Sequence, residues 1–241
     1  MKLLIDIQTK KQWLIIDEHK DFYTQYGKVS KEHLQQTSFV NEKQRAFCCI
    51  TPSIHDAIIH LQRGAQVILP KDAGYILAHC GITKTHTIVD AGAGSGWLTC
   101  YLAHYAKKVY SCDINEKHLA LVHKNVERLG LRNVVIKHHD IYSGLPATPD
   151  ILTLDVPEPW QVFSHTKKMR IGSFCVCYTP HITQAQQCVI QAQEHGFSVV
   201  HTTELIERTW LLGERKARPL KDEIGHTGFI TILRKLFDPI V

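Results

Sequence analysis

The sequence predicts an α/β fold, in which helices cover both faces of a parallel sheet, preceded by a small β domain. Three observations support this prediction. From about residue 84, short apolar runs typical of buried strands alternate with helical segments. Residues 1–62 instead contain short alternating runs separated by polar turns. A glycine-rich segment follows the first strand of the α/β region. We therefore expect two domains, residues 1–62 and 63–241.

The individual elements follow in order along the chain. A short helix is expected at residues 53–61, with Ser53 as its N-cap. Strands are expected at residues 87–90, 109–112, 134–136, 151–154, 174–178, 199–200 and 228–233. Helices are expected at residues 94–106, 115–129 and 183–195, the last two stopped by Gly130 and Gly196. Because ligands bind beyond the carboxyl ends of the strands in such sheets, functional residues should follow each strand.

The composition limits the class of protein. With 241 residues, 44% of them hydrophobic and 21% charged, the chain has ordinary globular usage and is neither disordered nor fibrous. The net charge of +5 is compatible with an RNA partner, although many enzymes that bind no RNA carry as much. The N-terminal segment contains Asp6 and Asp17 and does not resemble a signal peptide. No run approaches the roughly 18 apolar residues of a membrane helix, so we expect a soluble, cytoplasmic protein.

The eight cysteines form no C-x-x-C pair and no zinc-finger spacing. Cys175 and Cys177 alternate with Phe174 and Val176 on a predicted strand, where buried thiols act as small apolar groups. We favour this interpretation over a metal or redox role and expect no metal site. Disulfides remain an open alternative.

The glycine-rich segment, residues 90–96, reads Asp-Ala-Gly-Ala-Gly-Ser-Gly. Glycines permit a tight turn and let a ligand approach the backbone closely. The G-x-G-x-G spacing, with an acid two residues before the first glycine, differs from the G-x-G-x-x-G of dinucleotide-binding folds. A carboxylate at this point would repel a pyrophosphate and suits the cationic S-adenosylmethionine. The alternative is a strand–helix turn that binds no ligand.

Two further carboxylates follow the next two strands. Asp113 lies about 20 residues beyond the loop, where a carboxylate can accept both ribose hydroxyls of a nucleoside. It could also cap the helix beginning near Asn115, and the two roles are compatible. Asp140 could accept a hydrogen bond from the adenine amino group of the cofactor, although alone it would more often be a surface residue. Asp90, Asp113 and Asp140 at three successive strand ends predict a cofactor site.

The segment Leu-Asp-Val-Pro-Glu-Pro-Trp, residues 154–160, closes the fourth strand. Its two prolines stiffen the loop, and Trp160 adds a planar apolar surface. A rigid Asp155 beside aromatic surface suits a base swung out of its stack. The alternative is a prolyl turn with a capping aspartate.

Several segments together resemble one family, the tRNA (adenine-N1)-methyltransferases that modify the T-loop. They are RGAQVILPKDAGYIL (residues 63–77), AGAGSGWLT (91–99), LDVPEPW (154–160), YTP followed by Gln184, and RPLKDEIGHTGF (218–229). The glycine motif is common to class I S-adenosylmethionine-dependent methyltransferases, whereas LDVPEPW and GHTGF are much more specific. The resemblance covers roughly residues 63–235 and implies a Rossmann-like sheet. Asp90 replaces the more usual Glu, with the same charge.

The resemblance implies a set of cofactor-binding residues and a homotetrameric assembly. The residues expected to bind S-adenosylmethionine are Gln66, Asp90, Gly92, Gly94, Ser95, Gly96, Leu98, Thr99, Asp113, Asp140, Ile141 and Asp155. Lys71 and Asp72 are expected to cover the cofactor together with Gln66.

The resemblance also implies that Asp155 is the catalytic carboxylate, and the chemistry agrees. N1 of adenine carries a free lone pair and needs no deprotonation before it attacks a methyl group. It needs an in-line position and relief of the positive charge that develops on the ring. A carboxylate that accepts from the exocyclic amino group supplies both, so Asp155 is expected to orient the base rather than to act as a general base.

The remaining candidates concern the RNA. Tyr178 ends the fifth strand and is expected to stack on or hydrogen-bond to the target base, or else to be a core tyrosine. Arg218 and His226 are candidates for contacts near the target nucleotide, for a subunit interface, or for a structural role. The candidates for phosphate contacts are Lys167, Lys168 and Arg170, which are the basic residues closest in sequence to the catalytic loop.

Three hypotheses follow. The first is an adenine-N1 methyltransferase acting on the T-loop of tRNA at position 58, alone or with its neighbour 57. The second is a class I methyltransferase with a protein carboxylate or small molecule as acceptor, which LDVPEPW and GHTGF disfavour. The third is a non-catalytic RNA-binding partner subunit, which would be expected to lose the glycine loop or Asp155, whereas this chain keeps both.

Overall fold

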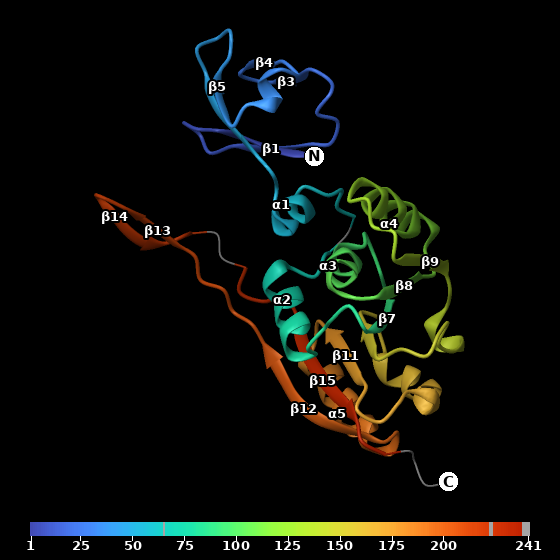
Figure 1. Ribbon diagram of the computed structural model, residues 1–241. Helices are drawn as coiled ribbons and strands as arrows, with labels where there is room; N and C mark the ends of the chain where they lie inside the picture. The colour runs from blue at the N-terminus through green and yellow to red at the C-terminus, as the bar shows by residue number, and fades with distance from the viewer. Residues whose placement is uncertain (65, 222–223, 238–241) are drawn as a thin grey trace. The chain divides into compact units, whose positions relative to one another are not determined.

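The computed structural model describes residues 1–64, 66–221 and 224–237 (Figure 1). The chain divides into two compact units, Met1–Gln62 and Arg63–Val241. Asp222 and Glu223, which belong to the last sequence motif, lie outside the described residues.

The N-terminal unit is built on a four-stranded antiparallel sheet in the order β2-β1-β6-β5. Its elements are β1 (Lys2–Asp6), β2 (Gln12–Ile15), the hairpin β3 (Phe22–Thr24) and β4 (Gly27–Val29), η1 (His33–Gln35), β5 (Ser38–Val40), β6 (Ala46–Ile50) and α1 (Ile54–Ile59). Leu4, Leu34 and Phe47 are fully buried in its core. Ser53 caps α1 as predicted, in a reciprocal capping box with Asp56.

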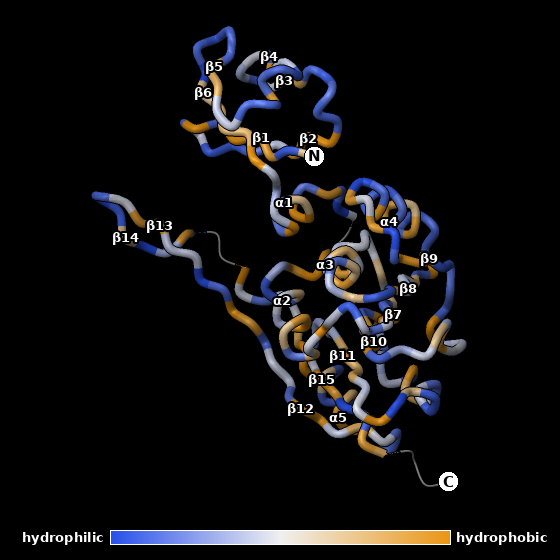
Figure 2. The backbone as a smooth tube through the Cα atoms, viewed as in Figure 1, coloured by the Kyte–Doolittle hydropathy of each residue, from blue (hydrophilic) through white to orange (hydrophobic). Residues whose placement is uncertain are grey.

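The second unit contains a seven-stranded sheet in the order β12-β15-β11-β10-β7-β8-β9. The strands are β7 (Thr87–Ala91), β8 (Lys108–Asp113), β9 (Val134–His138), β10 (Ile151–Leu154), β11 (Phe174–Thr179), β12 (Phe197–Glu204) and β15 (Phe229–Lys235). The central strand β10 is buried along its whole length, and Figure 2 shows apolar segments gathered at β10, β11 and β15. This arrangement places the ends of β7, β8, β9 and β10 along one edge of the sheet.

Helices lie on both faces of this sheet (Figure 1). They are α2 (Pro70–His79), α3 (Trp97–Tyr105), α4 (Glu116–Arg128), η2 (Ile141–Ser143), η3 (Pro159–Lys168) and α5 (Ile182–Glu194). α3 packs between α2 and α4, whereas α5 packs against η3. Each predicted strand and helix overlaps an observed element, and the α/β fold class is confirmed.

The expectation of an all-parallel sheet is wrong at one strand. β15 runs antiparallel to both of its neighbours, β11 and β12. β12 and β15 are not joined by a crossover helix. The chain passes instead through the hairpin β13 (Trp210–Gly213) and β14 (Lys216–Pro219) and returns alongside β12 in the opposite direction. The hairpin, α2 and η3 were not predicted.

The cysteines behave as expected for apolar groups. All eight are free, and all except Cys48 are buried. Burial raises the pKa of the Cys80, Cys100 and Cys112 thiols to about 12, which keeps them protonated. The described part of the chain brings no three His, Cys, Asp or Glu side chains together where they could hold a metal ion. Within the same ranges, no helix is long and apolar enough to cross a membrane.

Candidate active site

A cavity of about 310 Å³ opens at the carboxyl ends of β7, β8, β9 and β10, and a smaller hollow adjoins it. The cavity is lined by the glycine loop, by the residues that follow the three neighbouring strands, and by Gln66. Of the predicted cofactor-binding residues, Gly96 and Thr99 line neither space; the others line one or both: Gln66, Asp90, Gly92, Gly94, Ser95, Leu98, Asp113, Asp140, Ile141 and Asp155.

The glycine loop has three residues in the left-handed region, Gly92 (φ 80°), Gly94 (φ 54°) and Gly96 (φ 79°). A Cβ atom on Gly92 would lie 1.9 Å from the backbone oxygen of Asp155. Only glycine therefore lets the turn after β7 lie against the end of β10. The two strand ends are joined by a backbone hydrogen bond, from Asp155 N to Ala91 O at 2.9 Å.

Asp90 lies beneath this loop and is almost fully buried. Its Oδ2 accepts a hydrogen bond from Thr99 Oγ1 at 2.5 Å, and its Oδ1 accepts one from Thr153 Oγ1 at 2.7 Å. Burial raises its pKa. Each carboxylate oxygen thus accepts one hydrogen bond within the protein, and the side chain borders the smaller hollow but not the larger cavity. Its attraction for a cationic ligand stays a prediction. Thr99 supports Asp90 from below the site.

Asp113 is held in the wall of the cavity by three donors. Its carboxylate accepts from Gly94 N at 2.9 Å and from Asn115 N at 2.8 Å, and His118 Nδ1 lies 3.1 Å from Oδ2. Asn115, not Asp113, caps α4, because its side chain accepts from Lys117 N. The alternative role of Asp113 as the N-cap is therefore wrong. A carboxylate offers about four acceptor positions, so one remains for a ligand.

Asp140 and its neighbours form another part of the cavity wall. The exposed Asp140 side chain accepts from Tyr142 N at 2.9 Å and starts η2. Ile114, Ile141 and Tyr142 add apolar surface suited to a flat ring. Ile114, His118 and Tyr142 were missed in the sequence, although each lies within five residues of a predicted carboxylate.

Asp155 lines both the cavity and the smaller hollow. It is open to the cavity but surrounded by protein, and this desolvation, with the charges of Asp90 and Asp113, raises its pKa to about 7. Its loop is fixed from two sides, because Tyr142 Oη accepts from Glu158 N at 3.0 Å and Gln184 Nε2 donates to Pro157 O at 2.9 Å.

Trp160 does not extend this wall. It is half-buried against the core beneath the sheet and lines neither space. The expectation that it offers a surface to a swung-out base is not supported by this placement.

Tyr178 and the two residues expected to cover the cofactor lie together outside both spaces. Tyr178 Oη donates to Asp72 Oδ2 at 3.1 Å, and Lys71 Nζ donates to Asp72 Oδ1 at 2.7 Å. Neither Lys71 nor Asp72 lines the cavity or the hollow. The two residues are therefore not placed to cover the cofactor directly. Asp72 binds the tyrosine instead, and Lys71 binds Asp72.

His226 joins two strand ends. Its Nδ1 lies 2.5 Å from Glu204 Oε1, and its Nε2 lies 2.9 Å from Pro180 O. Both partners accept, so a protonated ring satisfies both contacts, and the Glu204 carboxylate followed by the Pro180 carbonyl raises the pKa of His226. This geometry favours the structural role. Arg218 lies on β14, where it is exposed and contacts only the Pro219 carbonyl among the hydrogen bonds described.

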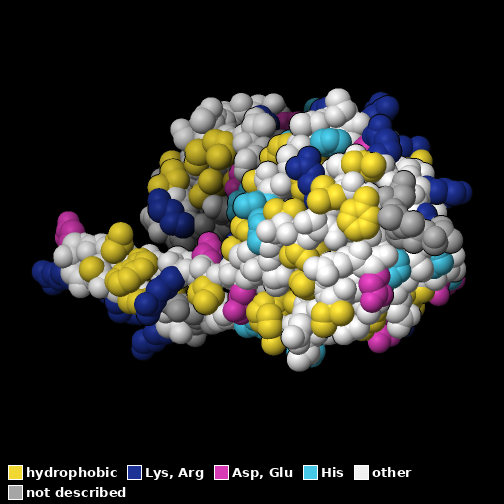
Figure 3. All heavy atoms as spheres, turned by 90° about the horizontal axis from the view of Figure 1, so that it is seen from below, with side chains coloured by type: hydrophobic (Ala, Val, Ile, Leu, Met, Phe, Trp, Pro, Cys, Tyr) yellow, Lys and Arg dark blue, Asp and Glu magenta, His cyan; other side chains and the backbone are white. Residues whose placement is uncertain are grey.

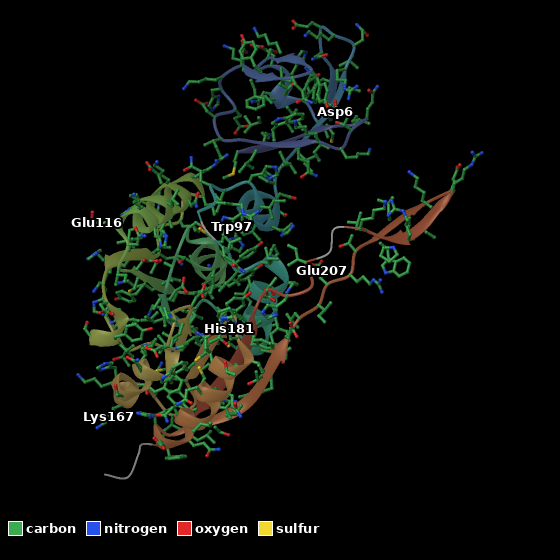
Figure 4. All side chains as sticks on the ribbon, turned by 180° about the vertical axis from the view of Figure 1, so that it is seen from behind. Asp6, Trp97, Glu116, Lys167, His181 and Glu207 are labelled. Carbon is green, nitrogen blue, oxygen red and sulfur yellow. The ribbon has the colours of Figure 1, made fainter. Side chains whose placement is uncertain are left out.

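The proposed phosphate-binding residues do not lie beside the loop that carries Asp155. η3 carries the chain from the carboxyl end of β10 back to the beginning of β11, so Lys167, Lys168 and Arg170 approach the opposite edge of the sheet. Arg170 pairs with Asp150, which directly precedes β10. Figure 4 shows Lys167 at the far end of the unit from Trp97. Closeness in sequence to Asp155 was a wrong guide to their position.

The site suits a cationic nucleoside. Asp113, Asp140 and Asp155 give the cavity negative charge, and its other walls are largely apolar. The Ser95 hydroxyl is buried without a hydrogen-bond partner among the residues that the structure describes, beside the smaller hollow. An S-adenosylmethionine-like group, with a ribose, a flat base and a charged amino-acid end, fits these features.

Comparisons with known proteins agree with this geometry. The family model of the tRNA methyltransferase complex GCD14 subunit matches residues 47–217. The tRNA (adenine(57)-N(1)/adenine(58)-N(1))-methyltransferase TrmI of Methanocaldococcus jannaschii is 31% identical, covering 99% of this chain and 96% of its own length.

Two solved structures share the fold. A SAM-dependent O-methyltransferase from Thermotoga maritima has a TM-score of 0.87 at 24% identity, over 100% of this chain and 94% of its own. TrmI from Aquifex aeolicus has a TM-score of 0.80 at 21% identity, over 98% and 96% of the two chains. These likenesses confirm the Rossmann-like methyltransferase fold.

Proposed function

Because this chain belongs to the family of the tRNA methyltransferase complex GCD14 subunit, we propose that it transfers a methyl group from S-adenosylmethionine to N1 of an adenine in the T-loop of tRNA. The observation that carries the proposal is the position of Asp155. Its side chain lines both the negatively charged cavity and the smaller hollow beside the glycine loop, and its own loop is fixed from two sides. By its name, the M. jannaschii relative acts on adenines 57 and 58. We propose position 58 as the target here, alone or with 57.

The cofactor would be held by residues of three strand ends. Asp113 would accept from a ribose hydroxyl, Asp140 from the adenine amino group, and Ile114 and Tyr142 would flank the adenine ring. The buried Ser95 hydroxyl would bind the amino-acid end, together with backbone groups of the loop. When bound, S-adenosylmethionine supplies an electrophilic methyl group whose leaving sulfur becomes neutral.

Asp155 would act on the target base. Its carboxylate accepts from the exocyclic amino group, which turns N1 toward the methyl group and excludes other orientations. As the N1–methyl bond forms and the methyl–sulfur bond breaks, the positive charge moves from sulfur to the ring. A fixed carboxylate next to the ring stabilises that charge without reorganisation.

This role predicts a dependence on pH. Since the pKa of Asp155 is raised to about 7, the carboxylate becomes protonated as the pH falls through that value and can no longer balance the charge on the base. We expect the single-turnover rate to fall about tenfold per pH unit below the pKa. In an Asp155→Asn variant the rate should not show this fall at low pH. A fall that persists in the variant would assign the titration to another group.

The hairpin supports the homotetramer that the family resemblance implies. Trp210 and Leu212 on β13 are 53% and 76% exposed, and Ile206 and Leu220 beside the hairpin are also exposed. Figure 3 shows apolar side chains gathered on this segment beside Lys and Arg. Apolar surface gathered in this way marks an interaction site, and we propose that it is covered by another copy of this chain.

Replacing both Trp210 and Leu212 by Glu should therefore reduce the assembly from four chains to a smaller species, because the charges cannot be buried. Light scattering after size exclusion measures the mass. An Ile171→Glu variant, which alters an apolar residue 67% exposed elsewhere, should keep the wild-type mass. A wild type that is already monomeric, or a double variant of unchanged mass, would contradict this proposal.

The remaining proposals concern contacts with the tRNA and the place where the protein acts. Lys167, Lys168 and Arg170 are candidates for phosphates away from the target nucleotide, since they lie at the opposite edge of the sheet. Arg218 is a candidate for the interface or for the RNA. We propose that the protein acts in the cytoplasm, where its substrate is found.

Transfer of labelled methyl groups to unmodified tRNA transcripts tests the proposed function. We expect transfer to the wild-type transcript, and its loss when adenine 58 is replaced; a residual signal that disappears with adenine 57 would assign the second position. Cofactor binding without any transfer to RNA would favour a protein or small-molecule acceptor, or a non-catalytic partner subunit.

A further inference from the structure

A network of buried polar groups joins the start of α2 to the substrate side of the sheet. Asp72 is fully buried, and the Lys71 side chain is only 12% exposed. Lys71 Nζ donates to Asp72 Oδ1 at 2.7 Å, to Leu205 O at 2.8 Å and to Thr227 Oγ1 at 2.6 Å. An ammonium group has three donors, so Lys71 is fully satisfied by α2, the exit of β12 and the GHTGF segment.

The second oxygen of Asp72 binds Tyr178. The tyrosine hydroxyl donates to Asp72 Oδ2 at 3.1 Å, and the residue is only 7% exposed. A Cβ atom on Gly228 would lie 2.7 Å from the tyrosine ring, so Gly228 leaves the space that the ring occupies. The ring is thus held from one side by packing and at its tip by a charged acceptor, which restricts it to one orientation.

Tyr178 lies beside Asp155. In the parallel pair β10–β11, Leu154 lies opposite Cys177, so Asp155, which directly follows β10, comes next to Tyr178, which is still part of β11 and pairs with β15 on its other side. Burial raises the pKa of Tyr178, and the nearby charges of Asp72 and Asp155 contribute to the increase. The hydroxyl therefore stays protonated near neutral pH and can donate to Asp72.

The same network directly follows the segment that lines the cavity and the hollow. Gln66 lines the cavity and the smaller hollow, Val67 and Ile68 line the hollow, and α2 begins at Pro70, shortly after them. A buried ion pair contributes little net stability, because desolvation of both charges offsets their attraction. Its placement between the cofactor-lining segment and the tyrosine beside Asp155 therefore calls for another role.

We propose that Lys71 and Asp72 are positioning residues for methyl transfer, which act by fixing Tyr178 beside Asp155 in the wall that receives the target adenine. The proposal rests on the proposed function. Lys71 neutralises Asp72 and ties it to two chain segments, and Asp72 orients the tyrosine. Neither residue touches the reacting atoms.

A double-mutant cycle tests this proposal. Asp72→Asn keeps the shape of the side chain but removes its charge, and Tyr178→Phe removes the hydroxyl that it binds. We expect each variant to slow single-turnover methyl transfer to tRNA about tenfold or more, with the Kd for S-adenosylmethionine by calorimetry changed less than about twofold. Because both changes break one link, the double variant should be no slower than the slower single variant.

A tyrosine on the same helix provides the control. Tyr75 Oη lies 2.8 Å from His201 Nε2 and 3.1 Å from Thr203 Oγ1, away from the cavity. Tyr75→Phe should lower the unfolding temperature about as much as Tyr178→Phe and leave the rate unchanged. This comparison separates a loss of stability from a loss of positioning.

The outcomes distinguish the inference from the proposed function. Rate losses that multiply in the double variant, or single variants as fast as the wild type, would overturn the inference while the wild type still methylates tRNA. A Tyr75→Phe variant as slow as Tyr178→Phe would do the same, since the effect would then be general. A wild type that transfers no methyl group to tRNA would overturn the proposed function and the inference together.

Discussion

Replacing Asp155 by Asn is expected to slow methyl transfer about 100-fold to 1000-fold, the usual effect of removing one fixed electrostatic group from an active site. Asparagine keeps the shape and can still accept from an amino group, but it carries no charge to balance the cationic ring. The loss should therefore appear in the single-turnover rate with saturating tRNA. Binding of the cofactor, measured by calorimetry, should change far less.

The same substitution should stabilise the protein at alkaline pH. A carboxyl whose pKa rises from its usual 3.8 to about 7 on folding favours the folded state when protonated, and that advantage is lost as the pH rises from about 4 to about 7. At pH 8 the Asn variant should therefore unfold at a higher temperature than the wild type, and near pH 4 the difference should be smallest. A variant that is fast, or less stable at pH 8, would contradict the role given to Asp155.

Replacing Gly92 by Ala is expected to reduce both cofactor binding and methyl transfer, the latter about 100-fold. The new Cβ would lie 1.9 Å from the backbone oxygen of Asp155, so either the glycine loop or the end of β10 must move. A displacement of about 1 Å is enough for a loss of this size. Calorimetry with S-adenosylmethionine and single-turnover rates measure the two effects.

Gly130 provides a matched control. It also has a left-handed backbone, at φ 64°, but a Cβ atom there meets nothing within 4 Å. Gly130→Ala therefore introduces the same kind of backbone strain without the clash, and it should lower stability slightly with activity retained. Equal losses in the two variants would mean that strain, rather than contact with Asp155, explains the effect.

The local parts of this molecule could be predicted from its sequence. Asp90, Asp113 and Asp155 stand at or just after the ends of short, mostly apolar runs, and parallel strands bring their carboxyl ends to one edge. The predicted topology therefore placed residues that are far apart in sequence in one site. His118 and Tyr142 could not be predicted, because nothing in the surrounding sequence indicates that a His or Tyr faces a cavity.

The non-local parts could not be predicted in the same way. The orientation of β15 depends on how the chain returns from the hairpin, which no periodicity records. The Lys71–Thr227 bond joins residues 156 positions apart. The distance of Arg170 from Asp155 follows from a crossover that carries the chain to the other edge of the sheet, so proximity in sequence indicated the wrong location.

We propose that the methyl acceptor is N1 of a tRNA adenine and that Asp155 orients this base. The most direct test is the mass-spectrometric identification of the nucleoside formed when purified protein, S-adenosylmethionine and unmodified tRNA react, with the Asp155→Asn variant in parallel. We expect 1-methyladenosine from the wild type and a strongly reduced yield from the variant. Another methylated nucleoside, or equal yields from the two proteins, would contradict it.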